Sequence, residues 1–155
     1  AMENGDVDAT ILTEPFFTNA VREGTVVPVY DLLKDEVSDS LRQSIFTCLF
    51  VTEDFLKTRQ DAAERIVRAT KNAVDLMYQD QGVGLEVARK YFPRVKPEVM
   101  KEVYSRLASG TTGRAFETKL TPANIAAESE FLTKAGLIKA PITFNDAVFD
   151  MSKVW

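Results

Sequence analysis

The stretch VDATILTEP, residues 7–15, ends an apolar run on a carboxylate, Glu14, and a proline, Pro15. Two interpretations of Glu14 stay open. It could place a charge at the mouth of a ligand cleft, where a carboxylate suits an amine or another hydrogen-bond donor and repels a bare anion. It could also be a solvated residue at the start of a helix, favoured there by the helix dipole, with Pro15 at the first helical position.

Arg114, Phe16 and Phe17 are further candidates for a binding site. Arg114 lies in the segment TTGRAF, and a loop next to a glycine can present a guanidinium to an anion. The alternative is an ordinary solvated loop arginine. Phe16 and Phe17 could form a stacking wall for a ligand, although we expect at least one of them in the core.

The residue types present argue against catalysis. The sequence has no histidine and one cysteine, Cys48. Without histidine there is no Ser-His or Cys-His nucleophile and no His-ligated metal site in this chain. Cys48 lies in IFTCLFV, which is typical of a small buried hydrophobe, and the acid pairs at 35–36 and 53–54 are typical of helix starts. We therefore expect no enzyme, no metal and no cofactor.

Bulk composition narrows the class of protein. A chain of 155 residues suits one domain with a core of its own. The net charge of −4 and the lack of a basic stripe argue against nucleic acid as a partner. No apolar stretch approaches the roughly 20 residues that span a bilayer, and no signal-peptide pattern is visible at the start.

The apolar pattern predicts three short strands in the first third of the sequence. Asp8 to Leu12 is expected to be a short buried strand, and Val26 to Val29 an edge strand or strand end because it contains Pro28. Ile45 to Val51 is almost continuously apolar, as expected of a strand covered on both faces.

Helices are predicted for most of the remainder. Thr13 is a possible N-cap for a helix over 15–22, and Thr58 and Asp61 have capping-box spacing at the start of a long amphipathic helix. Thr121 followed by Pro122 is a strong helix-start signal. The expected helices cover residues 15–22, 58–82, 85–92, 97–107 and 122–135. The tail, residues 137–155, is expected to be extended.

Five segments, taken in order, resemble one protein family. They are ENGDVDATILTEPF, FVTEDFLKT, AAERIVRATKNAVDLM, LTPANIAAESEFLTKAGLI and DMSKVW. They are similar to the ABC-transporter solute-binding proteins of the nitrate/sulfonate/taurine and thiamine-precursor group. The resemblance runs across nearly the whole chain but covers only the C-terminal half of such two-lobed proteins.

The resemblance implies an α/β fold, the C-terminal half of a two-lobed periplasmic-binding-protein-like architecture, with short strands followed by a helix-rich C-terminal part. Residues 1–14 would end the second lobe and approach the hinge, and residues 15–155 would form the C-terminal part of the first lobe. Thr13, Glu14 and Phe16 would then lie beside the ligand, with Arg114 as a further candidate. The missing N-terminal half would carry the export signal, so the chain would be a fragment, a truncated reading frame or an expressed piece of the gene.

The implied function is the substrate-binding component, or a fragment of it, of an ABC importer for a small polar organic or anionic solute. Its partners would be that ligand and an ABC permease, in a periplasmic or extracytoplasmic location, and the parent protein could be lipid-anchored or otherwise membrane-associated. The thiamine-pyrimidine synthases, enzymes on the same fold, need a histidine and a cysteine-rich motif that are absent here.

The alternative is a stand-alone interaction or sensory domain that uses half of the fold. Half a fold leaves apolar strand edges and helix faces uncovered. We therefore expect a homo-oligomer, formed for example by exchange of segments between copies.

Overall fold

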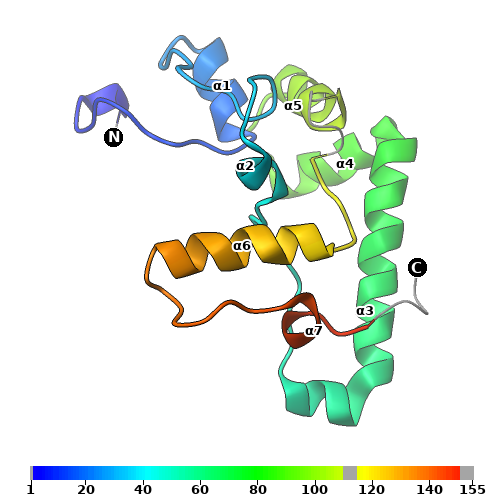
Figure 1. The fold of residues 1–155 in the computed structure, drawn as a ribbon. Helices are drawn as coiled ribbons and strands as arrows, with labels where there is room; N and C mark the ends of the chain where they lie inside the picture. Colours follow the sequence, from blue (N-terminus) through cyan, green and yellow to red (C-terminus); the bar gives the residue numbers. More distant parts are fainter. Residues whose placement is uncertain (1, 110–114, 151–155) are drawn as a thin grey trace. The chain divides into compact units, whose positions relative to one another are not determined.

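The computed structural model describes residues 2–109 and 115–150, and within those ranges the chain forms helices and no β-strand (Figure 1). The elements are η1 (Met2–Asn4), α1 (Phe16–Arg22), α2 (Asp39–Gln43), α3 (Glu53–Gln79), α4 (Gln81–Tyr91), α5 (Pro97–Ser109), α6 (Pro122–Lys134) and α7 (Phe144–Ala147). The chain divides into two compact units, each made of two separate segments. The first is Ala1–Glu36 with Leu76–Phe116, and the second is Val37–Asp75 with Glu117–Trp155.

The prediction of an α/β fold with short strands, as half of a two-lobed binding protein, is wrong. The three predicted strands have no regular secondary structure, and their side chains are largely exposed: Ile11 is 94%, Val29 98% and Phe50 89% accessible. A strand needs a neighbour to receive its backbone hydrogen bonds, and the described residues offer none. The strong β propensity of these segments is therefore not sufficient to make a sheet.

The helix predictions are mostly confirmed. The structure has a helix at each predicted location, and Pro97 and Pro122 open α5 and α6. Two details differ. Pro15, not Thr13, is the N-cap of α1. The tail, expected to be extended, contains the short helix α7, and its residues 151–155 lie outside the described ranges.

The long helix α3 begins earlier than predicted. Thr58 is not a capping residue, because its hydroxyl donates to the backbone oxygen of Asp54 one turn back. The side chain of Thr52 accepts from the amide of Phe55 instead. The backbone leaves the helical region at Arg59 (φ −139°, ψ 37°), so the helix is interrupted at the point where the sequence predicted its start.

In the first unit, α5 packs against both α1 and α4. Its buried residues Val99, Met100 and Val103 form most of the apolar core. Gly84 in α4 allows a close approach, because a Cβ atom there would lie 2.6 Å from Cζ of Tyr104 on α5.

In the second unit, α6 packs against α2 and α7. Its start is held by a capping box, in which Thr121 Oγ1 accepts from the amide of Asn124 at 3.2 Å. Buried Ser129 accepts from the amide of Ile142 at 2.8 Å, and the Glu128 carboxylate accepts from the amide of Ile45 at 2.6 Å. These polar contacts fasten the neighbouring chain segments to α6.

Candidate functional site

Glu14 lies immediately before α1 and serves its first turn. Pro15 follows through a cis peptide bond and is buried. The amide and the hydroxyl of Thr18 donate to the two oxygens of the Glu14 carboxylate at 3.2 and 3.0 Å. An acceptor at this place satisfies an amide that has no partner within the helix, and its negative charge is favoured by the helix dipole.

Arg106, in the last turn of α5, forms the centre of an ion-pair cluster. Its Nε lies 2.6 Å from Glu14 Oε1, and an Nη lies 3.0 Å from the Asp31 carboxylate. The side chains of Arg106, Glu14 and Asp31 are only 11%, 10% and 14% exposed. The guanidinium carbon also lies 4.8 Å from the centre of the Phe17 ring, within the range of a cation–π interaction. We call these residues with Thr18 the Arg106 cluster.

Burial and pairing act in opposite directions on Arg106. Burial lowers the pKa of the guanidinium, but hydrogen bonds and charge attraction from Glu14 and Asp31 outweigh it and hold the pKa above its ordinary value. The arginine therefore stays charged, and it donates hydrogen bonds to both carboxylates.

The Arg106 cluster links segments of the first unit that are far apart in the sequence, which is a structural role. Both Glu14 oxygens already have partners within the first unit. A ligand amine that bound Glu14 would have to compete with Arg106 and Thr18. The ligand-binding role of Glu14 stays a prediction, whereas its contact with the first turn of α1 agrees with the helix-start interpretation.

The other predicted site residues have different surroundings. Thr13 is exposed, and its backbone oxygen accepts from the amide of Phe17 at 3.0 Å. Phe16 is 60% exposed, while Phe17 is half-buried against Arg106. Arg114 lies outside the described residues. The structure thus gathers Thr13, Glu14 and Phe16 at the start of α1 simply because they are neighbours in sequence.

Sequence reasoning missed Asp31 and Arg106. They lie 75 residues apart, and Glu14 and Arg106 lie 92 apart. No local pattern pairs residues at such separations. The one available signal was the position of Arg106 on α5. It lies about one turn after Val103, on the same side of the helix as the buried residues Val99 and Val103.

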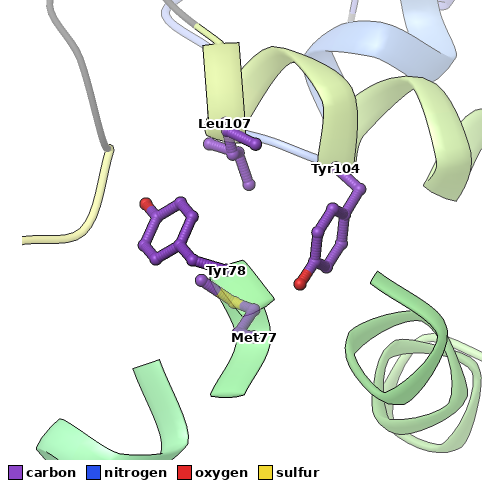
Figure 2. A pocket seen from close by; sticks show the side chains of 5 residues that line it. Met77, Tyr78, Tyr104 and Leu107 are labelled. Atoms are coloured by element: carbon purple, nitrogen blue, oxygen red, sulfur yellow. The ribbon is translucent and has the colours of Figure 1, made fainter. Parts of the chain in front are cut away.

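A small pocket also lies in the first unit (Figure 2). It is lined by Met77, Tyr78, Tyr104, Leu107 and Ala108 and has about 10 Å³ open to water, which is room for about one molecule. The Tyr104 hydroxyl is buried without a hydrogen-bond partner. Burial, with smaller effects from Tyr78 and Asp80, raises the pKa of Tyr104. A solute does not fit here.

The described residues contain no group of three or more His, Cys, Asp or Glu side chains that could hold a metal ion. No helix in the described ranges is long and apolar enough to cross a membrane. Comparisons with protein families, curated proteins and solved structures give no match. Function is therefore inferred from the residues and their surroundings alone.

One surface feature is a run of exposed, mostly apolar residues. Residues 46–51, FTCLFV, join α2 to α3, and all six are exposed. The accessible fractions of Phe46, Leu49 and Phe50 are 76%, 59% and 89%. Single exposed apolar side chains are ordinary on protein surfaces, but a contiguous apolar patch marks an interaction site.

Proposed function

We propose that this chain is an interaction module that associates with further copies of itself through exposed apolar segments. The observation that supports this function is the exposure of residues 46–51. The pocket beside Tyr78 and Tyr104 has room for about one water molecule, and the Glu14 oxygens in the Arg106 cluster already have partners.

Association is favoured because it removes these side chains from water. Full burial of one phenylalanine or leucine is worth roughly 1.5–3 kcal/mol, and aromatic residues dominate the energetics of interfaces. Association costs the translational and rotational entropy that the two partners lose. A few such side chains acting together on each copy can exceed that cost.

The test is the mass of the chain in solution over a range of protein concentrations, by light scattering and analytical ultracentrifugation. We expect a concentration-dependent dimer. Phe50→Lys should weaken association at least tenfold. Phe131→Lys is the matched control, since Phe131 is 63% exposed on α6 and the substitution adds the same charge. A monomer at all concentrations, with cooperative unfolding, would overturn the proposal.

A second candidate is the solute-binding component of an ABC importer. It is supported by the five ordered segments that resemble those proteins. The ligand, the permease partner and the extracytoplasmic location belong to this proposal.

Thermal shifts of this chain with amine, sulfonate and nitrate solutes test the second candidate. A stabilising solute whose effect disappears in Glu14→Gln would support it. No shift with any of these solutes would count against it. Permease and ATPase genes beside this coding sequence would also favour it.

A further inference from the structure

We propose that two copies of this chain pair residues 45–51 as antiparallel strands, about a two-fold axis through Cys48. The inference rests on the self-association proposed above and names its surface and register. The occupant of the exposed segment is a second copy of the same segment.

The backbone of this segment is free to pair. It runs as a single thread from α2 to the start of α3 (Figure 1). The amide of Ile45 is held by Glu128, but no backbone hydrogen bond joins residues 46–51 to any other part of the chain that the structure describes. Unpaired amides and carbonyls on an apolar extended chain are a template for another strand.

The segment lacks the residues that would prevent it from pairing with a strand of another chain. IFTCLFV is rich in aromatic and β-branched residues and contains no charge, proline or glycine. Natural proteins place charges, prolines or bulges on exposed edges to prevent association. Here the nearest charges, Arg42 and Glu53, lie beyond both ends of the segment.

The sequence is self-complementary in the antiparallel direction. With Cys48 on the axis, Phe46 lies opposite Phe50, Ile45 opposite Val51 and Thr47 opposite Leu49. Cross-strand aromatic and β-branched pairs of this kind stabilise a sheet. A two-fold axis brings the same patch of both copies together, as closed dimers require.

The flanking charges favour a second copy and select the antiparallel direction. Arg42 lies in the last turn of α2, and Glu53 and Asp54 lie in the first turn of α3, so antiparallel pairing would bring the end of α2 in one copy toward the start of α3 in the other. A parallel, in-register pair would bring Arg42 toward Arg42 and Asp54 toward Asp54. Like charges directly opposite one another are unfavourable.

Disulfide cross-linking can measure the register. Directly opposite residues in an antiparallel pair have Cα atoms about 4.5–5.5 Å apart, within the roughly 4.4–6.8 Å that a disulfide spans. Diagonal neighbours lie about 7–8 Å apart. Two thiols lose two protons and two electrons to an added oxidant such as diamide and form one S–S bond.

The variants are Thr47→Cys and Leu49→Cys, each in a Cys48→Ser background, which leaves one thiol per chain. Copies with tags of different size are mixed at a concentration where light scattering shows dimer and are then oxidised. We expect the mixed Thr47→Cys/Leu49→Cys dimer to form at least ten times faster than either homodimer. The control is Phe131→Cys in the same background, which should cross-link slowly with every partner.

Each other outcome overturns part of the proposal. Faster homodimers of Thr47→Cys would indicate either parallel pairing or an antiparallel pair with its axis through residue 47, and both would overturn the register. A dimer by scattering with no preference among the cysteine pairs would overturn the interface but leave the interaction module standing. Preferential cross-links from Leu49→Cys to Ile11→Cys or Val27→Cys would show a different segment as the occupant. No dimer at all would overturn both proposals.

Discussion

Arg106 is the residue that connects the most distant parts of the first unit. It pairs with Glu14 before α1 and with Asp31 in the loop after it, while its own backbone belongs to α5. Removing one partner of a nearly buried pair leaves uncompensated charge, which costs more than the pair contributes.

We expect Arg106→Met to lower the free energy of unfolding by about 3 kcal/mol, because the nearly buried Glu14 and Asp31 side chains would lose their cationic partner. The matched control is Arg22→Met, whose pair with Glu102 spans 2.8 Å but is 46% and 45% exposed. That loss should stay below about 1 kcal/mol. Urea denaturation at one fixed protein concentration measures both. Equal losses would mean that the Arg106 cluster has no special structural role.

Tyr104 should make stability depend on alkaline pH. Burial raises the pKa of its phenol above the unfolded value of about 10, so the folded chain keeps this proton longer than the unfolded chain. The corresponding stability is present below about pH 10 and is lost as pH rises through the folded pKa. Tyr104→Phe should abolish this loss.

At neutral pH, Tyr104→Phe should leave stability unchanged or raise it by up to about 1 kcal/mol, because it removes a buried hydroxyl without a partner. Tyr91→Phe is the control, since Tyr91 is 69% exposed. Thermal unfolding between pH 7 and 11 gives both results. A clear loss at pH 7 would show that the Tyr104 hydroxyl has a partner, such as a bound water.

At the scale of elements, the contact between α4 and α5 depends on Gly84. An added Cβ would clash with the Tyr104 ring and lie 2.6 Å from its Cζ atom. Gly84→Ala should therefore lower stability by about 1–3 kcal/mol through overpacking, although alanine is the better helix former. The double variant Gly84→Ala/Tyr104→Ala should recover part of the loss, as measured by a double-mutant cycle. Strictly additive losses would place the strain elsewhere.

The start of α6 depends on Thr121. Thr121→Ala removes a capping hydroxyl and should lower stability by about 1 kcal/mol. Thr133→Ala in the same helix is the control, because the Thr133 hydroxyl donates to the Ser129 backbone oxygen one turn back and alanine is favoured inside helices. Hydrogen exchange of the first turn of α6 should increase only in Thr121→Ala. Similar behaviour of the two variants would contradict the capping role.

At the scale of the whole molecule, charge and apolar exposure act together. The net charge is −4 and the isoelectric point is about 5.0. Two copies of the chain carry net charge of the same sign, and the repulsion between them opposes association. We therefore expect the dimer to tighten as pH falls from 8 toward 5, and we expect 0.5 M salt to reduce this difference because it screens the repulsion.

Sedimentation equilibrium at several pH values measures this trend. Phe50→Lys separates specific association from general insolubility near the isoelectric point, because it should remain largely monomeric throughout. Association of Phe50→Lys to the same extent as the unchanged chain near pH 5 would contradict a defined interface at residues 45–51.

The sequence alone determined most of the helices and the starts of α5 and α6, since the signals there are local. Pro97, and Thr121 with Pro122, act through their own backbone geometry and the amides next to them, so α5 and α6 begin as predicted. The position of Glu14 at a helix start is equally local. These features depend on neighbours within about one helical turn.

Only the tertiary structure decided whether Ile45–Val51 became a strand and which charge Glu14 meets. A strand obtains its hydrogen bonds from another segment, and the described residues supply none for this one. Arg106 reaches Glu14 across 92 positions, and no propensity or spacing encodes that encounter. The sequence determines what each segment can form, but pairing over long separations depends on which surfaces the folded chain brings together.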